Sequence, residues 1–206
     1  MKFNLALAGA GLLANLYAFF SLPRRVPLHF DLSGNPDRWG SKGELFFTGM
    51  GILAVLLLIY LLVPRIDPKR KSPWTSRGYH LLFSALFLIP VFLPFIPYFY
   101  LHRFPVTSAV VIFLSLLLVI MGNYLPSIKP NYFVGIRTPW TLEDERVWRR
   151  THRVGGWGFV LMGIITLPLA ILFPKMALVV FLVGLSALIV FLIIYSYLLW
   201  KREIKP

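Results

Sequence analysis

The stretch Met176–Trp200 reads MALVVFLVGLSALIVFLIIYSYLLW and contains no charged side chain. A helix needs about 20 mostly apolar residues to cross the hydrocarbon core of a bilayer, so this stretch is long enough to do so. The same criterion finds five more segments, and together they predict an all-α integral membrane protein with six transmembrane helices. The six segments are Phe3–Phe20, Phe46–Val63, Tyr79–Leu101, Val106–Leu125, Gly156–Phe173 and Met176–Trp200.

The composition agrees with this fold class. Of the 206 residues, 58% are hydrophobic and 14% are charged, whereas soluble domains contain about 25% charged residues. The chain has no cysteine, which excludes disulfide frameworks and cysteine nucleophiles. It also lacks the H-E-x-x-H and G-x-S-x-G motifs of zinc proteases and serine hydrolases. We therefore expect a non-enzymatic protein that needs no cofactor.

The basic residues predict the orientation in the membrane. The chain has 21 Lys and Arg against eight Asp and Glu. With six spans, 15 of the basic residues fall on the side of the two termini and six on the other side. Cytoplasmic loops carry an excess of Lys and Arg, so we predict a multi-pass protein of the plasma membrane with both termini in the cytoplasm. The excess positive charge then indicates contact with anionic lipid rather than direct binding of nucleic acid.

The first span could be mistaken for a signal peptide. Its apolar run exceeds the usual core of about 7–15 residues, and no A-x-A cleavage site follows it. We expect a retained helix.

All eight acidic residues lie outside the predicted spans. Ion-coupled carriers usually keep ionisable groups at mid-membrane, although carriers can also use backbone sites. Transport or export of a small hydrophobic or peptide substrate therefore remains the alternative function. The polar residues noted in or near the spans are Ser84, Thr107, Ser108, Ser115, Asn123, Thr166, Ser186 and Ser196.

The third span contains three prolines, Pro90, Pro94 and Pro97. Each proline removes a helical hydrogen bond and clashes with the preceding turn. We predict that this helix is kinked or broken near its outer end.

The outer loop, residues 21–45, is predicted to be structured. Apolar and other residues alternate over Val26–Ser33, which is the period of a short strand. The sequence Ser33–Asp37 (SGNPD) is typical of a turn.

Three side chains of this loop, His29, Asp31 and Asp37, could serve different purposes. They could bind a metal, although their spacing matches no established zinc signature. Alternatively, Asp31 or Asp37 could accept hydrogen bonds from turn amides while His29 pairs with a carboxylate. A third interpretation is a surface that recognises an extracellular ligand, with Trp39 as a contact residue.

The inner loop, residues 126–155, is predicted to contain a short helix. Thr138 or Thr141 is suited to begin it, and Pro139 suits the first helical position. Acidic residues then precede basic ones, an order that the helix dipole favours. Glu145 and Arg149, four apart, can pair. The charged residues are Glu143, Asp144, Glu145, Arg146, Arg149, Arg150 and Arg153.

This helix is expected to end where Gly155–Gly156 interrupts it before the fifth span. Trp140, Val147 and Trp148 fall on or near one of its faces. We therefore predict a short amphipathic helix at the cytoplasmic membrane interface.

Arg137 stands out in the same loop. It follows Gly135 and precedes a helix start, where backbone amides favour anions. It could hold Asp144 within the loop or bind an acidic partner. Asp144, Trp148 and His152 are spaced four residues apart and so lie along one face of a helix. Such a row of residues more often packs against a neighbouring segment than takes part in chemistry.

Two segments resemble known families. The inner one includes NYLP at 123–126 and KPNYFVGIRTPWTL at 129–142, with Asp144, Trp148 and His152. It resembles the signature of the SdpI-like membrane proteins. The outer segment, Leu22–Trp39, resembles an uncharacterised domain that often precedes that signature. On this basis we divide the chain into an N-terminal half, residues 1–101, and an SdpI-like half, residues 102–206.

The resemblance implies a function. The best-known member of this family protects cells against a secreted sporulation-delaying peptide toxin. It also holds a transcriptional repressor at the membrane when the toxin is bound. The resemblance therefore implies a membrane immunity or sensor protein with the toxin on the outer side and the repressor on the cytoplasmic side. The residues expected to bind these partners are His29, Asp37, Trp39, Arg137, Thr138, Trp140, Asp144 and Trp148.

Overall fold

A computed structural model of the protein describes residues 2–66 and 77–204. Within these ranges six helical segments are long and apolar enough to cross a membrane, which confirms the predicted fold class. The third segment consists of α3, a short 3-10 turn and α4. The elements are α1 (Lys2–Ser21), α2 (Lys42–Ile66), α3 (Arg77–Phe92), η1 (Leu93–Phe95), α4 (Ile96–Leu101), α5 (Val106–Tyr124), η2 (Leu125–Ser127), α6 (Pro139–Glu143), α7 (Glu145–Leu172) and α8 (Pro174–Ile204).

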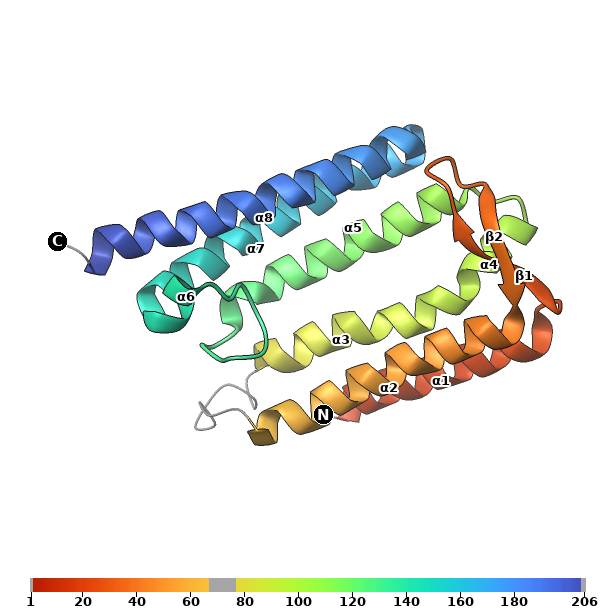
Figure 1. The fold of residues 1–206 in the computed structure, drawn as a ribbon, viewed down its shortest axis with the longest axis horizontal. Coiled ribbons are helices and arrows are strands. Elements are labelled where there is room, and N and C mark those ends of the chain that lie inside the picture. The colour runs from red at the N-terminus through yellow and green to blue at the C-terminus, as the bar shows by residue number, and fades with distance from the viewer. Residues whose placement is uncertain (1, 67–76, 205–206) are drawn as a thin grey trace.

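The helices run side by side and give the bundle two distinct ends (Figure 1). A β-hairpin, α4 and the turn between α7 and α8 lie at one end, which we call the hairpin end. Both chain termini, α6 and the segment 125–138 lie at the other, which we call the loop end (Figure 1).

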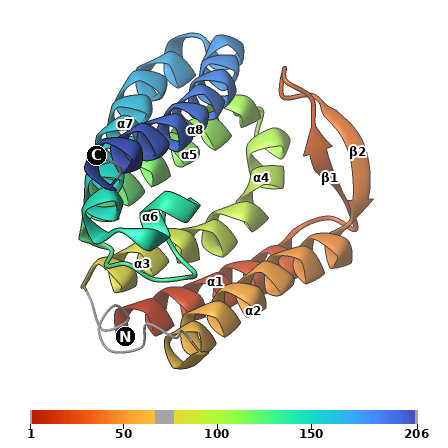
Figure 2. The ribbon, with the colours of Figure 1, turned by 60° about the vertical axis from the view of Figure 1, so that its left-hand side comes forward.

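The helices form two groups (Figure 2). In the first, α1 packs against α2 and α3 around a core that includes Tyr60, Phe83 and Phe87. In the second, α7 packs against both α5 and α8. Contacts between α3 and α5 join the two groups.

Close contact between α5 and α7 explains why one predicted boundary is wrong. We expected Gly155–Gly156 to end a helix, but α7 continues through both residues. A Cβ atom on Gly156 would lie 2.6 Å from the carbonyl oxygen of Gly122 in α5. Small residues let membrane helices approach closely, so Gly156 serves helix packing.

The predicted break in the third span is confirmed. The α-helix ends at Phe92, and a 3-10 turn separates it from α4. Pro94 has no N–H to donate to the carbonyl of Pro90, four residues earlier. The Asn15 side-chain amide in α1 donates to that oxygen instead, at 2.9 Å. A neighbouring helix thus supplies the hydrogen bond that proline removes.

The outer loop forms an antiparallel hairpin of β1 (Arg25–Phe30) and β2 (Pro36–Ser41). The short strand expected from Val26 onward is confirmed as β1. The intervening turn places Gly34 at φ 81°, a conformation that glycine adopts without strain. The second strand was not predicted, because its sequence PDRWGS lacks apolar alternation.

Candidate functional site

The eight predicted site residues lie at opposite ends of the bundle and cannot form one site. His29, Asp37 and Trp39 belong to the hairpin, whereas the other five lie between residues 137 and 148 at the loop end (Figure 1).

At the hairpin end, the polar side chains first stabilise the hairpin. Asp31 Oδ1 accepts hydrogen bonds from the backbone N–H groups of Ser33 and Asn35, both at 2.8 Å. The bond from Asn35 is the main reason that the pKa of Asp31 lies below its usual value. The Nδ1 atom of His29 lies 2.6 Å from Asp37 Oδ1. These contacts agree with the interpretation that Asp31 holds the turn and His29 pairs with a carboxylate.

The metal interpretation gains no support from the part of the chain that the structure describes. No three His, Cys, Asp or Glu side chains gather there in a metal-binding arrangement.

Aromatic contacts fix the hairpin on α4. The rings of Phe30 and Trp39 both pack against Tyr100, each with centroids 5.9 Å apart. Trp39 keeps 43% of its surface exposed. The hairpin is thus anchored on one side while Trp39 remains accessible.

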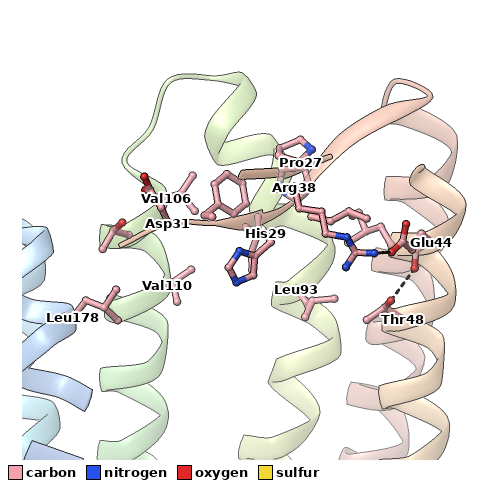
Figure 3. A pocket seen from close by; sticks show the side chains of 16 residues that line it. Pro27, His29, Asp31, Arg38, Glu44, Thr48, Leu93, Val106, Val110 and Leu178 are labelled. Atoms are coloured by element: carbon pink, nitrogen blue, oxygen red, sulfur yellow. Dashed lines mark hydrogen bonds and ion pairs between the residues drawn. The ribbon is translucent and has the colours of Figure 1, made fainter. Parts of the chain in front are cut away.

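A cavity of about 360 Å³ lies beneath the hairpin, and we call it the hairpin cavity (Figure 3). His29 points into the space between Leu93 and Val110, and Arg38 forms an ion pair with Glu44 to one side (Figure 3). Leu45 of α2 and Leu178 of α8 also line the cavity, so both helix groups contribute to its walls. Apolar walls with a few polar groups at the opening are typical of ligand sites.

At the loop end, Thr138 rather than Thr141, the two candidates from the sequence, begins α6, with Pro139 in the first turn. The hydroxyl of Thr138 accepts a hydrogen bond from the N–H of Thr141, and the Thr141 hydroxyl accepts one from the N–H of Thr138. The Thr138 hydroxyl also lies 3.1 Å from that of Ser196 in α8. These contacts hold α6 against the end of α8.

Trp140 packs on the same helix from α6. Its ring centroid lies 5.1 Å from that of Tyr197 in α8. Trp140 is half-buried in this position.

The prediction of a single amphipathic helix is wrong, because Asp144 separates two helices, α6 and α7. Its extended backbone, with φ −124° and ψ 128°, ends α6 and begins α7. Its carboxylate caps α7 by accepting from the N–H groups of Arg146 and Val147, at 2.7 and 3.1 Å. Burial alone would raise the pKa of Asp144, but the hydrogen bonds from Val147 and Arg146 outweigh it and leave the pKa below its usual value. The expected pair of Glu145 and Arg149 is present at 2.7 Å.

Trp148 does not face the membrane interface, and that part of the prediction is wrong. Its side chain is completely buried, and its Nε1 donates to the carbonyl of Ile128 at 2.8 Å. The ring of His152 stacks on it with centroids 4.0 Å apart. Nε2 of His152 accepts from the N–H of Ile136 at 3.0 Å. The stripe of Asp144, Trp148 and His152 is packing, as expected, and it fixes the loop on α7.

Arg137 lies on the surface next to this packed region. Its guanidinium donates to the carbonyl of Tyr132 at 2.6 Å. The interpretation that Arg137 holds Asp144 is not supported, because Arg146 pairs with that carboxylate at 3.3 Å. Binding of an acidic partner by Arg137 stays a prediction.

Sequence reasoning missed a polar cluster inside the first helix group. Asn4 donates to the carbonyl of His80 at 2.9 Å and accepts from the hydroxyl of Ser84 at 2.5 Å. The hydroxyl of Tyr60 lies 2.9 Å from Nδ1 of His80. Asn4 and Asn15 are 11 residues apart, about three helical turns, and this shared face could have revealed the pattern. Asn4, Ser84, His80 and Tyr60 bond to one another, so these four residues give no support to an open polar path for transport.

Comparisons with known proteins agree with the expected resemblance. Residues 127–196 match the SdpI/YfhL protein family, and residues 6–53 match a domain of unknown function (DUF1648). The chain is 24% identical over 192 residues to the protein named Immunity protein SdpI of Bacillus subtilis (strain 168), which covers 92% of this chain and 90% of that protein. No solved structure matches the chain. The matches place all predicted site residues inside the two recognised regions and support an immunity-type membrane protein.

Proposed function

We propose that this chain protects its host cell against a membrane-active peptide toxin and engages the toxin at the hairpin cavity. The similarity to an immunity protein supports the general role. The observation that carries the choice of site is the cavity itself, which has apolar walls and a polar opening at the end away from both termini.

The cavity matches the chemistry of such a toxin. A membrane-active peptide exposes large apolar side chains, and burying one fully is worth about 1.5–3 kcal/mol. The walls formed by Leu93, Ile96 and Val110 can receive such a side chain. Polar groups of the peptide would then meet His29 and Arg38 at the opening, where water is also accessible.

Signalling, if it accompanies protection, needs a connection between the two ends. Helix α5 provides one, because Val106 and Val110 line the cavity and its other end packs on α7 near Gly156. A cytoplasmic repressor would meet the surface around Arg137. In this proposal, α5 transmits toxin binding from the hairpin cavity to the cytoplasmic surface and so gives the protein its sensor function.

The distribution of charge supports the proposed orientation. We place the loop end in the cytoplasm and the hairpin end outside the plasma membrane, because Lys and Arg are concentrated at the loop end and termini. The natural absence of cysteine permits a direct test with Ser33→Cys and Glu143→Cys. A membrane-impermeant maleimide should label only Ser33→Cys in intact cells, and the reverse pattern would invert the topology.

The experiment for the function is a protection assay. The chain is expressed in a host that lacks its own immunity gene, and the cells are challenged with the sporulation-delaying peptide toxin. Val110→Phe fills the cavity and should reduce survival, whereas the control Leu116→Phe makes the same kind of change at an exposed position of the same helix. Membrane levels are compared by immunoblot.

The outcomes separate the two parts of the proposal. Survival with the wild type and Leu116→Phe but not with Val110→Phe would support both the function and the site. Full protection by Val110→Phe at normal levels would remove the cavity as the toxin site. Death of cells that express the wild type would remove this toxin as the ligand.

A further inference from the structure

A second hollow of about 860 Å³ opens at the hairpin end, beside the hairpin cavity. One wall is the turn between α4 and α5, with Arg103 and Phe104. The other wall is the turn between α7 and α8, with Phe173 and Lys175. The hairpin tip, Ser33–Gly34, also lines it. We call this space the turn groove.

The charged side chains that line the turn groove are both basic. Arg103 and Lys175 line it, and no acidic residue does. Neither makes an ion pair within residues 2–66 and 77–204. Asp31 lies near enough for Lys175 to help lower its pKa, but the oxygens of Asp31 already accept hydrogen bonds from the hairpin turn. The groove therefore carries two basic side chains against the nearby carboxylate of Asp31, and its net charge is positive.

Two helices also begin at this groove. The first turns of α5 and α8 leave backbone N–H groups without intrahelical partners. They add positive partial charge to that of the two side chains.

The rest of the groove is apolar and open. Phe104, Leu172, Phe173 and Met176 line it, and each keeps about half or more of its surface exposed. These residues lie where the membrane-spanning helices α5, α7 and α8 start or end. The hydrocarbon core of a bilayer meets its headgroups near the ends of such helices, so we expect the basic groups to face the headgroups and the apolar surface to face the acyl chains.

We propose that the turn groove is a binding site for an anionic phospholipid. The phosphate lies between Arg103 and Lys175, and an acyl chain follows Phe104, Leu172 and Met176. A zwitterionic lipid fits less well, because no acidic side chain lines the groove to receive its ammonium group. This inference does not depend on toxin binding, since it concerns a separate space at the same end.

The test uses full-length protein in nanodiscs of phosphatidylcholine with a minority of phosphatidylglycerol. After release into mild detergent, native mass spectrometry counts the lipids that remain bound. The wild type should retain phosphatidylglycerol several-fold above its share of the bilayer. The double variant Arg103→Gln with Lys175→Gln should lose this enrichment, while Arg103→Lys with Lys175→Arg should keep it.

A matched control removes two charges elsewhere at the same end. Arg24 and Arg25 are exposed but do not line the groove, so Arg24→Gln with Arg25→Gln should leave the enrichment unchanged. An equal loss in this control would show a general charge effect and overturn the site. The site is also overturned if the wild type shows no preference, or if millimolar inorganic phosphate displaces the lipid, which would show a site for free anions.

Discussion

The two ends of the bundle use similar residues in different ways. At the loop end, Trp148 is completely buried and bonded to Ile128, and His152 closes the loop over it. At the hairpin end, Trp39 makes a T-shaped contact with Tyr100 and stays 43% exposed. The loop end is held by a packed interior, whereas the hairpin end leaves room for ligands.

This difference shows how to interpret the family signature. Several of its prominent residues, including Thr138, Asp144 and Trp148, have structural partners that account for their presence. Arg137 is exposed and keeps its guanidinium on the surface. At the loop end, therefore, a partner is expected to recognise the surface that the packed residues present.

The largest expected effect comes from truncating the two tryptophans. Trp148→Ala should lower the free energy of unfolding by about 3–5 kcal/mol, as for other buried large-to-small changes. Trp39→Ala should cost less, about 1 kcal/mol, because the ring is partly exposed and the change removes its T-shaped contact with Tyr100. Thermal unfolding of both variants in the same detergent measures the difference. Equal losses would contradict the contrast between the two ends.

Two glycines permit the same comparison with a smaller change. Gly135 has φ 117°, and a Cβ there would lie 2.3 Å from Nε2 of His152. Gly34 has φ 81°, and a Cβ there would lie 3.0 Å from the hydroxyl oxygen of Thr107. Gly135→Ala should cost about 1–3 kcal/mol from the strained backbone alone, with the clash in addition.

Gly34→Ala should cost less than Gly135→Ala, because a side-chain hydroxyl can move aside. The measurement is again the unfolding temperature in detergent. A larger loss for Gly34→Ala would mean that the hairpin tip is more tightly packed than the loop over His152.

The smallest effects are expected at the carboxylates. Asp144→Ala should cost about 1 kcal/mol through loss of the α7 cap. Asp37→Ala breaks an exposed pair with His29, and such pairs contribute about 0–1 kcal/mol. We expect Asp37→Ala to insert and unfold like the wild type but to weaken protection against the toxin. Unchanged protection would remove Asp37 from the candidate site.

The stability that Asp144 contributes should depend on pH. Its folded pKa is lowered, so the contribution is fully present above the unfolded value of about 3.9 and is lost as pH falls through the lower folded pKa. Asp144→Asn keeps a capping side chain without this titration. The difference between the wild type and Asp144→Asn should shrink in unfolding measurements below about pH 4, and a constant difference would contradict the assignment.

The sequence predicted those parts of the fold that depend on residues close together in the chain. The length of each apolar run defined the six helices, the spacing of Pro90, Pro94 and Pro97 indicated the broken helix, and Thr138-Pro139 marked the start of α6. These signals act within one or two helical turns. They need no knowledge of neighbouring elements.

The remainder depended on contacts between distant segments. Gly156 could not be assigned to a helix interior without knowing that it faces Gly122. Trp148 was expected at the membrane interface. Its burial could not be foreseen, because its hydrogen-bond partner Ile128 lies 20 residues away in the sequence. The candidate cavity combines the hairpin with residues from α2 to α8, so no single segment of sequence carried it.

The hydrogen bond from Asn15 to Pro90 has a consequence for biogenesis. Asn15 lies in α1, which is synthesised before α3, and its side-chain amide donates to the carbonyl of Gly11 in its own helix. Its second partner arrives 75 residues later, with α3. N-terminal segments generally fold first during synthesis, yet the Asn15 amide gains this second acceptor only when the third helix is inserted. We therefore expect the first three helices to assemble as a unit, and a chain cut before Pro90 to leave the Asn15 amide without this acceptor in the membrane.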